Sequence, residues 1–267
     1  MFLVTVFAAA AAPSILSPAA TPEAPAPTPA MPAALPALGP APQDDEVEDG
    51  VWTGSVNVGG IFASGNTEST TFGVSADARM QSGPNRYMGK LFYNYTEDGN
   101  NNVTTQDNRG LELEYNRFFN DRLYGLAQGS YYVDEIIGLN ARTTLGVGAG
   151  YQIINEEHLQ WDGELGVSFV DEDFENDVDD NDFTAARLAT GLDWIVNEQV
   201  TYGQDLTFLQ SLDESDDYII TNDSRVSVKL SESMVASLQY LFNYDNTPPA
   251  GFDEDDHRFI ATVGWTF

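Results

Sequence analysis

Residues 255–267, at the C-terminal end of the sequence, read DDHRFIATVGWTF. Apolar and aromatic residues hold one parity of this stretch: Phe259, Ala261, Val263, Trp265 and Phe267. The other parity carries polar residues: Arg258, Thr262 and Thr266. Successive side chains of a β-strand point to opposite faces, so the stretch predicts a strand with one apolar face and one polar face. That division is typical of the strands of a transmembrane β-barrel.

The same two-residue period runs back from this strand to Val51. It predicts twelve strands, near 51–63, 68–81, 85–97, 106–118, 121–134, 139–153, 157–171, 182–196, 199–211, 217–230, 233–246 and 255–267. Each segment has roughly a dozen residues, whereas strands of globular proteins average about five or six. Tilted membrane strands need about 9–11 residues to cross the apolar band. The sequence therefore predicts an all-β fold, a transmembrane antiparallel up-and-down β-barrel of about 12 strands.

The connections between these strands differ in length. Tight turns are expected at 82–85, 120–121, 155–156, 197–198 and 231–232. Most of the other connections are longer, at 98–105, 135–138, 172–181, 212–216 and 247–254, although 64–67 is short. Short periplasmic turns alternate with longer extracellular loops in outer-membrane barrels. An even number of strands then places both termini in the periplasm.

Charged residues inside the strands test this interpretation, because a charge on the lipid face near the midplane costs about 2–4 kcal/mol. In the predicted strands the basic residues, apart from Arg109, share the parity of the polar face. The expected lumen-lining residues are Asp77, Arg79, Lys90, Glu112, Glu114, Arg142, Asp162, Glu164, Arg187, Arg225, Lys229 and Arg258. Three further arginines fall at short turns: Arg86, Arg117 and Arg122. Arg109 does not fit the parity and is expected at the extracellular rim, and the parity of 121–134 is ambiguous.

Two readings of the lumenal charges stay open. They form a structural network that fills a narrow lumen, or a selective lining in which inward charges set solute preference. Aromatic residues form two bands along the strands, as at the two membrane boundaries. The short-turn band contains Tyr151, Trp161, Trp194, Tyr202 and Trp265. The competing fold is a soluble, secreted β-sandwich binding protein with an aromatic core.

The N-terminal part of the chain has a different composition. Residues 1–12, MFLVTVFAAAAA, are apolar and end in small residues, which predicts a signal peptide cleaved between about 12 and 20. Residues 13–50 are rich in Ala and Pro and end in an acidic patch, which predicts a disordered leader. The barrel is expected to occupy residues 51–267.

Composition excludes several classes of function. The 267 residues contain 42 acidic and 11 basic side chains, a formal charge of −31, which argues against nucleic acid as a partner. The chain has no Cys, so a disulfide scaffold and thiolate metal sites are excluded. Neither His158 nor His257 is followed by a Ser two residues on, so the chain is not expected to be an enzyme. No cofactor is expected.

Acidic residues gather at the expected extracellular loops. Residues 171–182 hold eight of them, and 213–217 and 253–256 add two further acidic loops. Oxygen-rich clusters attract Ca²⁺ or Mg²⁺, but the EF-hand spacing is absent. The metal assignment therefore stays unknown, between a solvated acidic rim and divalent cations bridging to lipopolysaccharide. The glycines at 146, 148 and 150 lie within a strand and predict relief of crowding rather than a nucleotide loop.

Several motifs resemble a known family. The residues that carry the resemblance are Trp52–Val56, Ser64–Ser69, Tyr131–Asp134, Gly138–Arg142 and Gly146–Tyr151. They are similar to the YdiY-like, salt-induced outer-membrane proteins of Gram-negative bacteria, over about residues 51–267. The resemblance implies an outer-membrane barrel of poorly defined function with a link to salt stress. It implies no catalytic residues.

These observations lead to a functional expectation. The protein is expected to be a porin-like outer-membrane barrel, a narrow passive channel for ions or small polar solutes linked to salt or envelope stress. The alternative is a structural envelope barrel that does not conduct. The expected partners are outer-membrane lipid, lipopolysaccharide and the barrel assembly machinery, for which Trp265 and Phe267 would be the recognition signal. Solute selectivity and oligomeric state are left open by the sequence.

Overall fold

A computed structural model of the chain describes residues 49–63, 69–99, 102–175, 181–247 and 254–267. The expected signal peptide and nearly all of the expected leader lie outside the described residues. Within them, no helix is long and apolar enough to cross a bilayer.

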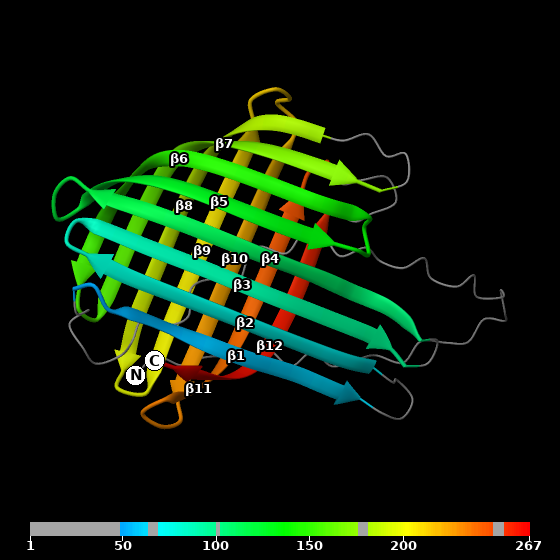
Figure 1. Ribbon diagram of the computed structural model, residues 1–267, viewed down its shortest axis with the longest axis horizontal. Coiled ribbons are helices and arrows are strands. Elements are labelled where there is room, and N and C mark those ends of the chain that lie inside the picture. Colours follow the sequence, from blue (N-terminus) through cyan, green and yellow to red (C-terminus); the bar gives the residue numbers. More distant parts are fainter. Residues whose placement is uncertain (1–48, 64–68, 100–101, 176–180, 248–253) are drawn as a thin grey trace, which may run out of the picture.

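Twelve antiparallel strands form one closed barrel, in which each strand pairs with its sequence neighbours and β1 pairs with β12 (Figure 1). The strands are β1 (Trp52–Ala63), β2 (Ser69–Ser82), β3 (Asn85–Asp98), β4 (Val103–Phe118), β5 (Leu123–Asp134), β6 (Leu139–Glu156), β7 (Leu159–Phe174), β8 (Asn181–Asn197), β9 (Val200–Ser211), β10 (Tyr218–Lys229), β11 (Met234–Asp245) and β12 (Asp255–Thr266). The predicted fold class is confirmed, and the soluble β-sandwich is wrong. Closure gives every strand a partner on both sides, although β1 and β12 pair over only five residues each.

The C-terminal strand β12 closes the barrel. Residues 262–266 of β12 pair with residues 55–59 of β1, from Ser55↔Thr266 to Gly59↔Thr262. Beyond the last pair, Gly54 and Phe267 exchange two backbone hydrogen bonds, of 3.0 and 3.1 Å. The chain therefore ends at the short-turn end of the barrel, where β1 begins (Figure 1).

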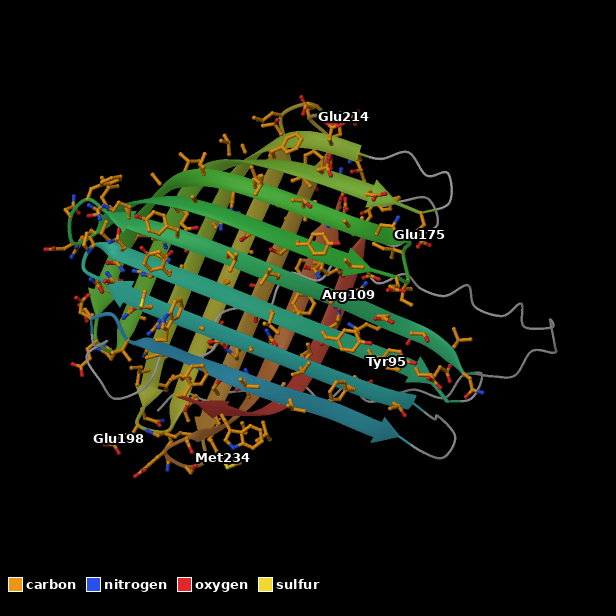
Figure 2. The ribbon with its side chains drawn as sticks, in the orientation of Figure 1. Tyr95, Arg109, Glu175, Glu198, Glu214 and Met234 are labelled. Carbon is orange, nitrogen blue, oxygen red and sulfur yellow. The ribbon has the colours of Figure 1, made fainter. Side chains whose placement is uncertain are left out.

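The two ends of the barrel differ. The short-turn end carries the connections 83–84, 119–122, 157–158, 198–199 and 230–233. The long-loop end carries the connections after β1, β3, β5, β7, β9 and β11. In Figure 2, Glu198 and Met234 mark the short-turn end, while Tyr95, Arg109 and Glu175 lie toward the long-loop end.

The outer face of the barrel is apolar, as the alternation requires. Its most exposed large side chains include Leu145, Leu165 and Phe259, with exposed fractions of 60%, 63% and 69%. Trp161, Trp194 and Trp265 are also exposed on this face. A band of exposed apolar side chains of this extent is unfavourable in water and favourable in lipid.

The parity that the sequence left ambiguous is resolved in β5. Tyr124, Leu126 and Tyr132 are buried inside the barrel, whereas Leu123 and Tyr131 are exposed on its outer face. The pairing of β5 with β6 shifts register between Tyr132 and Asp134. A bulge places two residues opposite one and disturbs the alternation, so Tyr132, Val133 and Asp134 are all buried.

Candidate functional site: the barrel lumen

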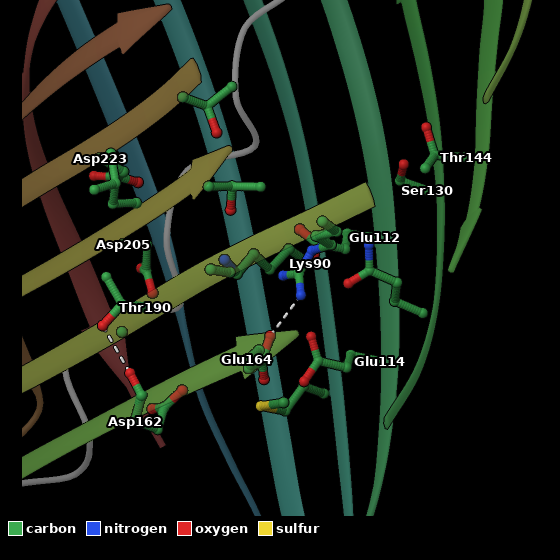
Figure 3. A pocket seen from close by; sticks show the side chains of 18 of the residues that line it. Lys90, Glu112, Glu114, Ser130, Thr144, Asp162, Glu164, Thr190, Asp205 and Asp223 are labelled. Carbon is green, nitrogen blue, oxygen red and sulfur yellow. Dashed lines mark hydrogen bonds and ion pairs between the residues drawn. The ribbon is translucent and has the colours of Figure 1, made fainter. Parts of the chain in front are cut away.

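The inner face of the barrel encloses a cavity of about 300 Å³. Side chains of the nine consecutive strands from β2 to β10 line it. The lining contains both acidic and basic groups (Figure 3). Charged groups facing inward in a membrane barrel require water or oppositely charged partners, so their arrangement determines what the cavity can accept.

Eight of the twelve expected lumen residues line this cavity: Arg79, Lys90, Glu112, Glu114, Arg142, Asp162, Glu164 and Arg187. The remaining four lie elsewhere. Asp77 accepts a hydrogen bond of 2.5 Å from Ser55 on the neighbouring strand. Arg225 is buried among β8, β9 and β10, and Arg258 interacts electrostatically with Asp134. Lys229 shares the parity of Arg225, toward the end of β10.

One ion pair crosses between strands in the middle of the lumen. Arg187 on β8 donates to Glu164 on β7 at 2.7 Å, and both side chains are about nine-tenths buried. Glu112 and Glu114 on β4 also interact electrostatically with Arg187. The arginine therefore serves as a shared counterion for carboxylates from two walls of the barrel.

A second network begins at Tyr124 on β5. Its ring lies over Gly150 on β6, where an added Cβ would come within 2.1 Å of the ring carbon Cζ. The hydroxyl reaches β7, where it lies 2.8 Å from Glu164 Oε1 and 3.2 Å from Asp162 Oδ2. Gly150 therefore relieves crowding as expected of this glycine stretch, because it leaves room for the ring of Tyr124.

Arg86 belongs to the lumen, which corrects its assignment to a short turn. Its guanidinium lies 4.7 Å from the ring centroid of Phe118 and 5.8 Å from that of Tyr124, and it lines the cavity. The second residue of a strand can direct its side chain inward even beside a turn. Arg109, by contrast, lies at the long-loop end as expected, bonded to Glu135 at 3.0 Å.

Sequence reasoning missed several lumenal acids. Glu172 on β7 pairs with Arg142, and Asp193, Asp205 and Asp223 line the cavity. The alternation of the strands could have predicted two of them. Asp193 has the same parity as Arg187 in β8, and Asp223 has the same parity as Arg225 in β10. Asp205 is exposed within a strand wall that lines the cavity, so its carboxylate is accessible from the lumen.

The long-loop half of the lumen is filled by side chains. Phe92, Tyr132 and Leu139 form a buried apolar cluster, against which Ile137 of the β5–β6 connection packs. The Asp134 carboxylate holds this connection by accepting bonds from Tyr132 Oη at 2.7 Å and from the backbone N–H of Ile136 at 3.1 Å. The connection therefore lies against the lumen and narrows its mouth.

The surroundings of His257 and of the acidic loop 171–182 can be described in part. His257 lies within hydrogen-bonding distance of Tyr240 Oη at 2.8 Å and Asp255 Oδ2 at 2.9 Å, and its ring also contacts the ring of Phe242. Among the described residues, His257 makes no hydrogen bond to a Ser. The acidic loop 171–182 extends into residues 176–180, which lie outside the described residues, and no group of metal-ligating side chains is arranged for a metal within the rest.

Comparison with solved structures identifies the fold. The NanC porin matches with a TM-score of 0.51 at 10% sequence identity, over 80% of this chain and 98% of that chain. The KdgM porin in complex with disordered oligogalacturonate matches with a TM-score of 0.44 at 10% identity, over 81% and 99%. The translocator domain of the autotransporter NalP from Neisseria meningitidis matches with a TM-score of 0.44 at 12% identity, over 81% and 87%. The similarity to the first supports an outer-membrane β-barrel fold.

Sequence comparison gives the family. No curated protein matches the chain. A family model described as "Protein of unknown function, DUF481" matches residues 56–267, which confirms the resemblance to the YdiY-like proteins. The chain therefore belongs to the DUF481 family.

Proposed function

We propose that the protein is a narrow passive channel in the outer membrane for ions and small polar solutes. The observation that carries this proposal is the cavity of about 300 Å³ lined by charged side chains of nine consecutive strands. A barrel whose only task was structural would have no need to keep the carboxylate of Asp205 accessible from within. Inward charges of this kind set ion preference in channels.

The membrane orientation and the partners complete the proposal. The short-turn end faces the periplasm and the long-loop end faces the outside, in the arrangement usual for such barrels. The outer face contacts lipid, and the acidic loops meet lipopolysaccharide through divalent cations. Trp265 and Phe267 serve as the signal for the barrel assembly machinery. Replacing Phe267 by Ala should then lower the amount of folded barrel in the membrane, with unchanged expression.

Recording from planar bilayers tests the channel directly. The full chain, refolded in detergent and shown to be heat-modifiable on a gel, should produce discrete current steps in KCl. The reversal potential in a salt gradient then reports the sign of the preferred ion. Folded protein that gives no current above that of the detergent alone would contradict the proposal.

The second candidate is a structural barrel that does not conduct, and one observation favours it. The long-loop half of the lumen contains fully buried side chains, among them Asn108, Asp134, Leu139 and Asn243. Side chains packed in this way leave little room for a solute. A deletion strain with weakened envelope integrity under salt stress but unchanged solute uptake would support this candidate, and reduced uptake would support the channel.

A further inference from the structure

The lumen has two walls of opposite charge. In the closed ring of strands, β3 lies opposite β9 and β2 lies opposite β8. Lys90 on β3 and Asp205 on β9 both line the cavity, as do Arg79 on β2 and Asp193 on β8. Each of these basic residues therefore faces an acidic residue across the space, in addition to Asp77 and Glu112, which are paired with Lys90 on the neighbouring strands.

The basic wall consists of Arg79, Arg86 and Lys90, on the adjacent strands β2 and β3. Two carboxylates lie beside this wall, because Asp77 on β2 and Glu112 on β4 are paired with Lys90. Asp77 accepts from Ser55, and Glu112 and Glu114 on β4 share Arg187 with Glu164. The three cationic groups line the cavity and Asp77 does not, so β2 and β3 give their side of the cavity a positive character.

The acidic wall has a notch in it. Asp162, Gly191, Asp205 and Asp223 occupy directly paired positions on β7, β8, β9 and β10. A Cβ on Gly191 would lie 3.2 Å from Asp162 Oδ1 and 3.2 Å from Asp205 Oδ1. The missing side chain thus leaves the backbone of Gly191 open to the cavity, with a carboxylate oxygen on each side.

The guanidinium of Arg225 occupies a similar position over another glycine, Gly203. Gly203 lies on the neighbouring strand β9 and pairs with Asp193 and Arg225. An added Cβ there would lie 3.1 Å from Arg225 Nη2 and 3.4 Å from Asp193 Oδ1. The Arg225 guanidinium therefore lies over a glycine and beside a carboxylate. The notch at Gly191 repeats this construction, and there the neighbouring cavity can supply the cation from solution.

We infer that the cavity binds small zwitterionic solutes of the amino-acid type, with the ammonium group in the Gly191 notch between Asp162 and Asp205 and the carboxylate toward Lys90 and Arg79. This inference rests on the proposed channel function and names its solute class. A dipolar solute lowers its energy by aligning between walls of opposite charge, whereas a simple cation or anion gains at one wall and is repelled at the other. The cavity volume of about 300 Å³ corresponds to roughly ten water molecules at about 30 Å³ each, enough for such a solute and a few waters.

Four solutes with the same number of heavy atoms test the inference: alanine (zwitterion), alaninamide (cation), lactate (anion) and lactamide (uncharged). The full chain is reconstituted into liposomes, and uptake of each radiolabelled solute is measured at pH 6. Binding of alanine to the detergent-solubilised protein is measured in parallel by titration calorimetry. Alanine should enter about fivefold faster than alaninamide and lactate, the factor expected from one charge contact in water, and faster still relative to lactamide, which lacks both charges.

Variants assign the effect to the walls. Asp205→Asn and Gly191→Ala should each remove most of the preference for alanine, the first by taking away a charge and the second by filling the notch. Asp171→Asn makes the same chemical change at an exposed residue near the long-loop end of β7. Gly163→Ala adds a methyl group beside Ile153, at an ordinary contact distance of 3.6 Å. Both controls should keep the preference.

The outcomes separate the inference from the channel proposal. Equal entry of all four solutes, or a preference unchanged in Asp205→Asn and Gly191→Ala, would overturn the inference while leaving a conducting channel. Alanine that binds the solubilised protein but does not enter liposomes would support the binding site and refute the channel. Neither binding nor entry, from protein with discrete current steps in KCl, would also overturn the inference.

Discussion

The hydroxyl end of the Tyr124 ring lies over Gly150, so close that a Cβ on the glycine would come within 2.1 Å of Cζ. The relationship lets a side chain of β5 reach over β6 and bring its hydroxyl to Asp162 and Glu164 on β7. Three adjacent strands are thereby joined inside the lumen by one aromatic residue. The lumenal network therefore depends on the lack of a side chain at Gly150 as well as on the charged groups.

Replacing Gly150 by Ala should therefore displace Tyr124 and separate its hydroxyl from both carboxylates. We expect the free energy of unfolding to fall by about 1–3 kcal/mol, from overpacking and the loss of buried hydrogen bonds. Urea unfolding in detergent micelles, followed by tryptophan fluorescence, measures the change. Gly163→Ala is the control and should remain within about 0.5 kcal/mol of the wild type. Equal stability of the two variants would show that Tyr124 is not held over Gly150.

The ion pair of Arg187 and Glu164 should be worth much more than the pair of Arg109 and Glu135. The first is about nine-tenths buried, whereas both members of the second are about half exposed. Arg187→Gln leaves a buried carboxylate without its counterion and should cost about 3 kcal/mol. Arg109→Gln should cost less than about 1 kcal/mol.

The same substitution has an electrical consequence. Without Arg187, the carboxylates of Glu112, Glu114 and Glu164 lose a shared positive neighbour. In protein that still folds, the reversal potential in a salt gradient should move toward cation selectivity. Arg109→Gln, at the rim, should leave it nearly unchanged. A shift toward anion selectivity in Arg187→Gln would contradict the arrangement of these charges.

The comparison of sequence and structure shows which features alternation can predict. Strand positions and the outer face follow from it, because a charge on the lipid face is costly. Applied to the acidic residues of β8 and β10 as it was to those of β2, β4 and β7, the same rule would have found Asp193 and Asp223. It could not assign β5, where a bulge near Tyr132 breaks the period. Arg86 shares the parity of Lys90 within β3, so the rule would also have placed it in the lumen, had its position beside a turn not been given more weight. The contact of Tyr124 with Gly150 depends on packing between strands and leaves no mark in the period.

Removing part of the apolar cluster at the mouth should enlarge the passage. Ile137 packs against Phe92, Tyr132 and Leu139, so Ile137→Ala should weaken the attachment of the β5–β6 connection and raise the single-channel conductance. The effect on stability should be about 2 kcal/mol or less, since Ile137 is only partly buried. Leu145→Ala, which shortens a lipid-facing side chain, should leave the conductance unchanged. A conductance that is the same in both variants would mean that the connection does not limit the passage.

Adjacent residues on β6 provide the sharpest test that the barrel spans a membrane. Thr144 lines the cavity and Leu145 is exposed on the outer face, so the same substitution at the two positions differs only in the side of the wall. Leu145→Lys places an ammonium group toward lipid and should destabilise the barrel in vesicles by about 2–4 kcal/mol. Thr144→Lys places it in the cavity, between Ser130 and Val170 on the neighbouring strands, at a much smaller cost. Folding into lipid vesicles, followed by heat-modifiable migration, compares the two. If both variants fold equally well in lipid while the wild type remains soluble without detergent, the outer face is not in contact with a membrane.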